Sequence, residues 1–128
     1  MPFIVDTTVL IDAARHKEPA YSWLRAALRR PGEVAVSAVN VAEFFAGLRP
    51  DERPRWEAFV DELACWDVTR EIAKLAGTYQ YDSARRGQTI HIADALVAAT
   101  AFTVGADVVT DNIKDFPMAD VTTIRLVP

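Results

Sequence analysis

Four acidic side chains lie in parts of the sequence where their neighbours are apolar or small. Asp6 ends the first apolar run, Glu43 and Asp94 each interrupt a longer one, and Asp115 closes an acidic cluster that follows another apolar run. An ionised carboxylate beside a core-facing surface costs free energy unless a nearby group compensates its charge. Several carboxylates that converge on one point repel one another and call for a cation. The pattern therefore indicates a metal-dependent active site.

The types of ligand narrow the choice of metal. Mg²⁺ prefers oxygen ligands and keeps several of its waters, so a few carboxylates suffice to hold it, and Mn²⁺ suits the same set. Zn²⁺ favours histidine and cysteine, but His16, His91 and the lone Cys65 form no zinc pattern. His91 lies one helical turn before Asp94 and can face the same side, although a structural or surface role is the simpler interpretation. We therefore expect Mg²⁺ or Mn²⁺.

Short apolar strands alternate with helices along the chain. The expected strands are Phe3–Asp6, Val34–Ser37, Cys65–Val68, Val108–Thr110 and Thr122–Val127. The first helix is expected to begin at Thr7 or Thr8, and the later helices to cover Tyr21–Leu28, Val39–Leu48, Arg53–Leu63, Arg70–Ala84 and Ile92–Val104. Gly105 is the expected C-cap of the last helix. This alternation predicts an α/β fold with a parallel sheet and right-handed crossovers. No repeat or linker is visible, so residues 1–128 are expected to form a single domain.

The predicted elements bring the acidic residues toward one place. In parallel α/β folds, functional groups gather beyond the carboxyl ends of the strands, and Asp6 and Asp111 each follow a predicted strand, with Asp115 four residues later. Glu43 and Asp94 lie on helices whose small neighbours allow close packing around a pocket. Each acid also has a plain structural interpretation on its own, such as a helix N-cap or a turn residue. Their convergence is therefore a prediction for the structure to test.

Composition excludes several classes of protein. Half of the residues are hydrophobic (51%) and a quarter are charged, as in an ordinary folded domain. The stretch Ala95–Ala106 is too short to span a bilayer. Met1-Pro2-Phe3 shows no leader peptide, which together with the single cysteine favours the cytoplasm. A net charge of −4 argues against a protein that coats nucleic acid, but it does not exclude an enzyme that cleaves it.

Arginines and tryptophans offer possible contacts for nucleic acid. The arginines are grouped as Arg25, Arg29 and Arg30, then Arg49, Arg53 and Arg55, then Arg85 and Arg86. Such groups can hold phosphates, or they can be solvated helix faces with charge pairs. Trp23, Trp56 and Trp66 are candidates for stacking on bases, although we expect at least two of them to pack in the interior.

Taken together, four segments of the chain resemble the PIN-domain nucleases, and among them most closely the small VapC-like toxins of bacterial toxin–antitoxin pairs. The segments are Ile4–Asp12, Val36–Ser37 leading into Val41–Gly47, Asp94–Ala101 and Val109–Phe116. They occur in the order of the family with roughly its spacing, and they bracket almost the whole chain.

The resemblance implies a three-layer α/β/α sandwich around a short parallel sheet, with Mg²⁺ or Mn²⁺ held by clustered acids. It also implies an endoribonuclease that cleaves single-stranded or loop RNA by in-line attack of a metal-activated water, a cognate antitoxin that suppresses it, and a homodimer. Asp6, Glu43 and Asp94 match the first three acidic positions of the family. For the fourth position we favour Asp115 over Asp111.

Further polar residues of the matching segments are expected to orient the carboxylates and the metal-bound water. They are Thr7, Ser37, Thr110, Asp111 and Asn112. A separate apolar set, Phe44, Phe45, Leu48, Trp56 and Phe59, is either ordinary core packing, a groove for an antitoxin segment, or a homodimer face.

Three other functions are compatible with parts of the sequence. A PIN-type nuclease could process RNA without any antitoxin, and a catalytically inactive PIN domain could bind only its partner. An Asp-based phosphotransfer enzyme also places an acid after its first strand, but Glu43 and Asp94 have no role in its chemistry. The toxin interpretation accounts for all four segments.

Overall fold

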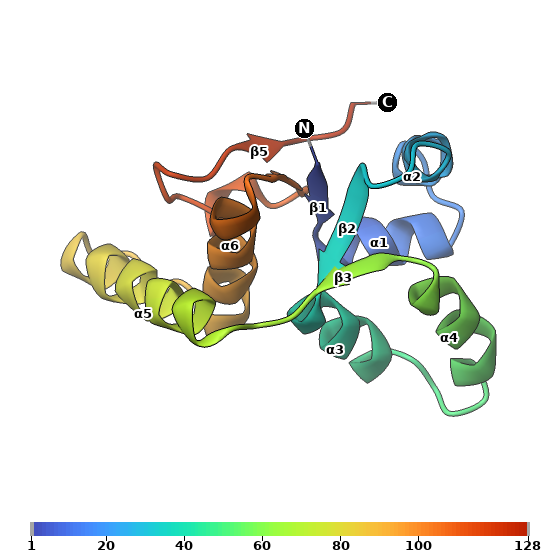
Figure 1. Ribbon diagram of the computed structural model, residues 1–128, viewed down its shortest axis with the longest axis horizontal. Coiled ribbons are helices and arrows are strands. Elements are labelled where there is room, and N and C mark those ends of the chain that lie inside the picture. The colour runs from blue at the N-terminus through green and yellow to red at the C-terminus, as the bar shows by residue number, and fades with distance from the viewer. Residues whose placement is uncertain (1, 128) are drawn as a thin grey trace.

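A sheet of five parallel strands organises the structure, a computed structural model that describes residues 2–127 (Figure 1). The strands are β1 (Phe3–Val5), β2 (Val34–Ser37), β3 (Ala64–Trp66), β4 (Asp107–Val109) and β5 (Thr123–Ile124), in the order β3-β2-β1-β4-β5. Because every neighbouring pair is parallel, the carboxyl ends of all these strands lie along one edge of the sheet.

Helices cover both faces of the sheet. They are α1 (Thr7–Ala14), α2 (Ala20–Leu28), α3 (Ala38–Ala46), α4 (Arg53–Asp61), α5 (Arg70–Arg85) and α6 (Ile92–Val104). One apolar core joins the sheet to α5 and α6, and the other joins it to α1, α2 and α4. The predicted α/β/α sandwich with a short parallel sheet is therefore confirmed. Of the helices formed by residues 2–127, none has the length and hydrophobicity needed to cross a membrane.

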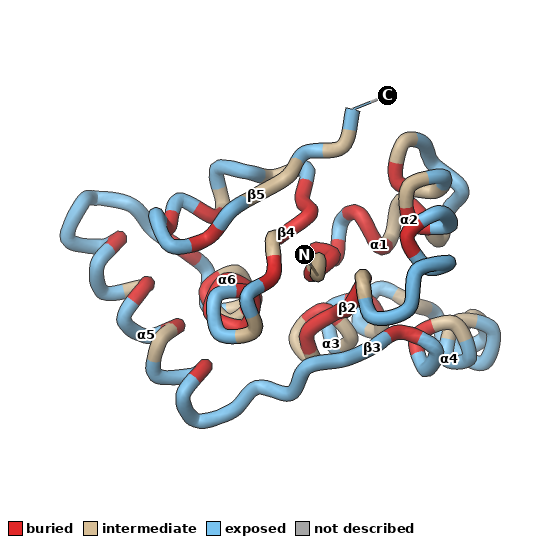
Figure 2. The backbone as a smooth tube through the Cα atoms, turned by 45° about the horizontal axis from the view of Figure 1, so that its top comes forward, coloured by how far each residue is buried: buried red, intermediate tan, exposed pale blue. Residues whose placement is uncertain are grey.

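The strands are short and apolar because both of their faces are buried. Successive side chains point to opposite faces, so Ile4 joins the core under α5 and α6, and Val5 joins the core under α1 and α2. Figure 2 shows the buried residues concentrated in the central strands and α6, whereas β3 is exposed along its length. The interior of the sheet is thus rigidly packed, and its β3 edge is open.

Helix α3 lies between the two cores at the carboxyl edge of the sheet. It begins directly after β2, and Ser37 at its N-cap accepts a hydrogen bond from the backbone N–H of Val39. Phe44 packs into the core of α1, α2 and α4, while Val39 packs against the core of α5 and α6. The helix is therefore fixed from both sides, which matters because it carries Glu43.

Most predicted boundaries agree with the structure to within one or two residues. β2 and α6 match their predicted ranges, and Gly105 ends α6 in the left-handed conformation with φ of 71°. The last strand is shorter than predicted, because only Thr123 and Ile124 find partners on the three-residue strand β4. The short 3₁₀ helix Ile113–Asp115 was not predicted. It carries one of the four acidic residues.

Two glycines give a matched test of the backbone. An added Cβ meets no heavy atom within 4 Å at either Gly105 or Gly77, but only Gly105 has a positive φ. Gly105→Ala should lower the free energy of unfolding by about 1 kcal/mol, because alanine is strained in this conformation. Gly77→Ala, inside α5, should raise it by up to about 1 kcal/mol. Urea unfolding measures both, and a change of the same sign in both variants would contradict this account.

Candidate active site

The first carboxylate is held on both of its oxygen atoms at the carboxyl edge of the sheet. Asp6 follows β1 and caps α1, where its Oδ1 accepts a hydrogen bond from the backbone N–H of Thr7 at 2.9 Å. Its Oδ2 accepts one from the hydroxyl of Thr110 at 2.8 Å. β1 and β4 are in register, with Val5 opposite Val109, so Asp6 and Thr110 are the next pair along the ladder. The buried carboxylate is therefore fixed by the strand pairing itself.

The second carboxylate is positioned by a chain of hydrogen bonds from α1 and α3. The hydroxyl of Thr7 donates to Glu43 Oε1 at 2.7 Å and accepts from the side-chain amide of Asn40 at 3.1 Å. Asn40 Oδ1 in turn accepts from the backbone N–H of Ser37 at 3.0 Å. Glu43 is exposed, but its donor Thr7 and the amide behind it are buried. The network therefore lets buried side chains orient a carboxylate that faces the solvent.

The third and fourth carboxylates approach from α6 and from the 3₁₀ helix. Asp94 lies in the first turn of α6, where the helix dipole favours negative charge, and Asp115 is half-buried at the end of Ile113–Asp115. The pKa of Asp94 is raised to about 6, first by burial and then by the charges of Asp115, Asp6 and Glu43, against a smaller lowering by nearby His91. The structure therefore brings all four acidic residues together.

The same repulsion acts on Asp6. Its pKa is raised by burial, lowered by the hydrogen bonds from Thr110 and Thr7, and raised again by the charges of Glu43 and Asp115. Within residues 2–127, the ion pairs join Arg30 to Glu33 and Arg49 to Asp51 and Glu52, and none reaches the four carboxylates. The cluster thus has an excess of negative charge.

The donor set fits a hard cation. Every candidate ligand is a carboxylate oxygen, which suits Mg²⁺ or Mn²⁺ and not Zn²⁺. In the described part of the chain, no three or more His, Cys, Asp or Glu side chains form a group that could hold a metal ion, so no metal cage is preformed there. Mg²⁺ needs no such cage, because it retains several waters and takes few protein ligands. The roles of Asp6, Glu43, Asp94 and Asp115 as metal ligands stay predictions.

The remaining predicted residues differ in how close they lie to the carboxylates. Thr7 and Thr110 contact them directly, whereas Ser37 acts through Asn40. The backbone N–H of Asn112 donates to the Thr110 hydroxyl at 3.0 Å. Asp111 is exposed, and its backbone carbonyl accepts a hydrogen bond from Arg125.

Asn40 is the residue that the sequence analysis missed. It is completely buried, and it connects the N-cap of α3 to the hydroxyl that holds Glu43. The signal was present in the sequence, since Ser37 and Asn40 have the three-residue spacing of a capping box. A polar residue at that spacing inside an apolar run marks a helix start that needs a buried partner.

Comparison with known proteins shows the family of the chain. The family model for the PIN domain matches residues 3–120. A protein named ribonuclease VapC19 from Mycobacterium tuberculosis is 40% identical over 118 residues, which cover 90% of this chain and 92% of that protein.

Solved structures share the fold. The crystal structure of VapBC2 from Rickettsia felis bound to a promoter DNA fragment contains a chain with a TM-score of 0.84 and 21% identity, covering 99% of this chain and all of that one. A toxin–antitoxin complex from Klebsiella pneumoniae gives a TM-score of 0.78 and 22% identity, covering 96% and 98% of the two chains. Since the family model spans nearly the whole sequence and the relative is this similar, the chain belongs to the PIN domain family.

Proposed function

We propose that this protein is an endoribonuclease that acts as the toxin of a toxin–antitoxin pair. The observation that carries the proposal lies at the carboxyl edge of the sheet, where burial and the nearby charges of Asp115, Asp6 and Glu43 raise the pKa of Asp94. The likeness to proteins named ribonuclease VapC supports the substrate, and the fold likeness to a toxin–antitoxin complex supports the partner. A homodimer in the cytoplasm, as the family resemblance implies, is part of the proposal.

A divalent cation, Mg²⁺ or Mn²⁺, would be held by these four carboxylates and would supply positive charge to the scissile phosphate and acidify the attacking water. Thr110 and the backbone of Thr7 fix both oxygens of Asp6, so this carboxylate cannot rotate away from its ligand position. Such preorganisation lowers the reorganisation needed when the phosphate binds.

Glu43 is the best placed group to take the proton from the attacking water. It is the most exposed of the four carboxylates, and the bond from Thr7 occupies only its Oε1. The other oxygen is free to accept a proton on the solvent side of the site. Asn40 is then a positioning residue, because it holds the hydroxyl that orients Glu43.

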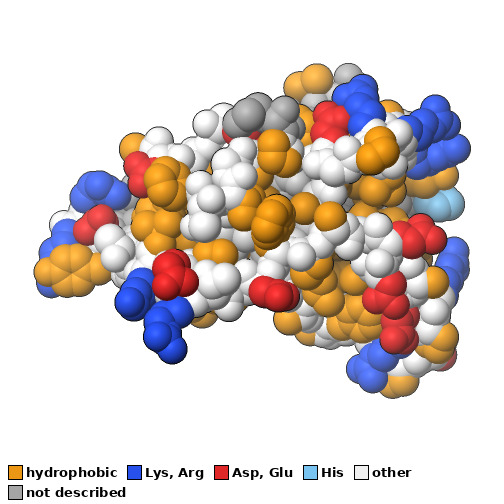
Figure 3. Space-filling model, in the orientation of Figure 1, with side chains coloured by type: hydrophobic (Ala, Val, Ile, Leu, Met, Phe, Trp, Pro, Cys, Tyr) orange, Lys and Arg blue, Asp and Glu red, His pale blue; other side chains and the backbone are white. Residues whose placement is uncertain are grey.

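Basic side chains form no continuous stripe on the one face of the molecule that Figure 3 shows. On the face in Figure 3 they form separate groups over α2, α4 and α5, interspersed with acidic side chains. Arg30 and Arg49 are engaged in ion pairs with nearby acids. The arginine groups therefore offer only scattered phosphate contacts, which fits an enzyme that binds a short stretch of RNA.

Cleavage of single-stranded RNA tests the proposed function. The purified protein should cut RNA in Mg²⁺ or Mn²⁺ but not in EDTA, and Asp94→Asn should slow cleavage at least about 100-fold. Asp115→Asn should be similarly damaging, whereas its neighbour Asp111→Asn should cleave nearly as fast as the wild type. Gel assays with matched, folded proteins measure all three. Full activity of Asp94→Asn, or cleavage that resists EDTA, would contradict the assignment.

The pKa of Asp94 also predicts how stability depends on pH in metal-free buffer. Since the pKa rises from 3.8 to about 6 on folding, the folded state binds the proton more tightly, and the free energy of unfolding falls as the pH rises through this range. Asp94→Asn should therefore be more stable than the wild type by about 1 kcal/mol at neutral pH, allowing for partial exposure, and equally stable near pH 4. Thermal melts in EDTA measure the difference, and a difference independent of pH would refute it.

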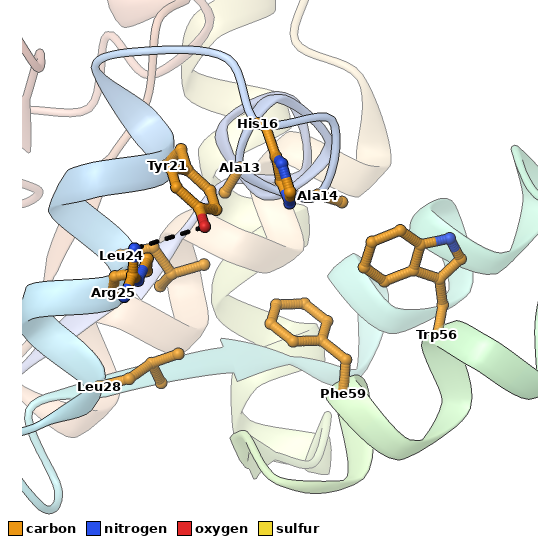
Figure 4. Close-up of a pocket in the computed structure, with 9 residues that line it drawn as sticks. All are labelled: Ala13, Ala14, His16, Tyr21, Leu24, Arg25, Leu28, Trp56 and Phe59. Carbon is orange, nitrogen blue, oxygen red and sulfur yellow. Dashed lines mark hydrogen bonds between the residues drawn. The ribbon is translucent and has the colours of Figure 1, made fainter.

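An apolar groove between α1, α2 and α4 is suited to the antitoxin (Figure 4). Trp56 and Phe59 of α4 face Tyr21, Leu24 and Leu28 of α2 across it. The groove encloses about 170 Å³, and a second hollow of about 370 Å³ shares Ala14 and Trp56 with it. An amphipathic helix could lay its apolar face along such a surface.

The residues of the predicted apolar set divide between core and groove. Phe44 is buried and packs edge-to-face on Trp56, with ring centroids 6.2 Å apart. Trp56 and Phe59 present their other sides to the groove, and Leu48 lines the second hollow. Arg25 lies beside the groove over the ring of Tyr21, so acidic residues on the antitoxin would be attracted to this rim.

Leu28 gives a selective test of the groove. It is 43% exposed, and Leu28→Glu should weaken binding of the cognate antitoxin at least about tenfold without changing RNA cleavage. Phe102→Glu, which alters a side chain 50% exposed on α6, is the matched control and should bind normally. Calorimetric titration measures both. If the antitoxin bound normally to Leu28→Glu, the groove would be excluded as its binding site. If the protein had no cognate antitoxin at all, an RNA-processing nuclease would be favoured instead.

A further inference from the structure

Trp66 differs from the other two tryptophans in its surroundings. Trp23 packs edge-to-face on Phe3 with ring centroids 5.6 Å apart, and Trp56 packs on Phe44. Trp66 is 46% exposed, and among residues 2–127 no aromatic ring or cation stacks on it. Its indole is therefore free to take a partner from solution. The other two tryptophans pack against aromatic rings but are only half-buried, so the expectation that at least two lie in the interior is met only in part.

The strand register places Trp66 in line with the catalytic carboxylates. β3 pairs Trp66 with Ser37 of β2, and the β1–β2 register, with Ile4 opposite Ala35, makes Ser37 the neighbour of Asp6. Paired residues of parallel strands point to the same face, and adjacent strands lie about 4.8 Å apart, so extending this register by two residues puts the backbones of Trp66 and Asp6 two strand spacings apart, about 10 Å. In an extended single strand of RNA, a base and the phosphate of the neighbouring nucleotide are separated by a distance of this order.

We propose that Trp66 is the platform on which a base of single-stranded RNA stacks, beside the phosphate that is cleaved. The proposal rests on the proposed ribonuclease function. Single-stranded RNA is bound largely by stacking of its bases on exposed aromatic side chains, and any base can stack because each has a π-face. The exposed indole of Trp66, near the carboxylates, is suited to hold the RNA strand while the RNA backbone crosses the site.

The charges around Trp66 indicate that stacking contributes more than ion pairing. Arg70, an exposed side chain, begins α5 four residues later, where a cation is unfavourable for the helix dipole. Asp67 and Glu71 in the same stretch carry the opposite charge. These three charges sum to −1, so they do not attract a polyanion, and RNA binding here should depend only weakly on salt.

Binding of a short fluorescent single-stranded oligoribonucleotide tests the proposal, using the Asp94→Asn background with Mg²⁺ so that the probe is not cut. Trp66→Ala should weaken binding about 5- to 100-fold. Trp66→Phe should restore most of the affinity but abolish the quenching of tryptophan fluorescence that RNA causes. Tyr81→Ala, which removes an aromatic side chain 58% exposed on α5, is the matched control and should bind like its parent.

Other outcomes would overturn the proposal in distinguishable ways. Unchanged affinity in Trp66→Ala, with quenching retained in Trp66→Phe, would show that no base stacks on this residue. A smaller sedimenting species for Trp66→Ala with unchanged RNA affinity would assign Trp66 to a contact between two copies of the chain. If folded wild-type protein neither bound nor cut RNA, the ribonuclease function itself would fail.

Discussion

The parallel pairing of β1 with β4 is the constraint on which the rest of the molecule depends. It sets Asp6 opposite Thr110, and the hydrogen bond between their side chains joins residues 104 positions apart in sequence. Both side chains are buried, so neither has water as a substitute partner, and losing one would leave the other unsatisfied. The same sheet orients α3 and α6, which carry Glu43 and Asp94. The ladder thus places Asp6 directly, and the sheet places Glu43 and Asp94 through the helices packed on it.

The free-energy cost of desolvation is compensated to different degrees at the four carboxylates. Asp6 is the most buried, but two hydrogen bonds offset part of its desolvation. Asp94 depends instead on the dipole of α6. Under the proposed function, a cation held by the cluster would neutralise negative charge that would otherwise repel an RNA substrate.

Sequence patterns predicted the helices and strands well, but they predicted the contacts between distant residues less well. The β-branched run Val34–Ser37 and the small-residue helix closed by Gly105 have local signals, and both were predicted within their observed bounds. Asp115 could be favoured over Asp111 only through a family resemblance, since both look like turn residues in sequence. Asn40 and Trp66 depend on long-range register, because their partners come from other strands and helices. No local pattern distinguishes the exposed tryptophan from the two that pack.

The long separation of Asp6 from Thr110 has a consequence during synthesis. Ribosomes add residues from the N-terminus, and domains made of non-local contacts complete their folding only when the distant segments are available. Asp6 is made 104 residues before its partner Thr110, and the Asp115 carboxylate follows later still. A growing chain that has not reached Asp115 therefore cannot assemble the carboxylate cluster, and under the proposed function it cannot yet cleave RNA.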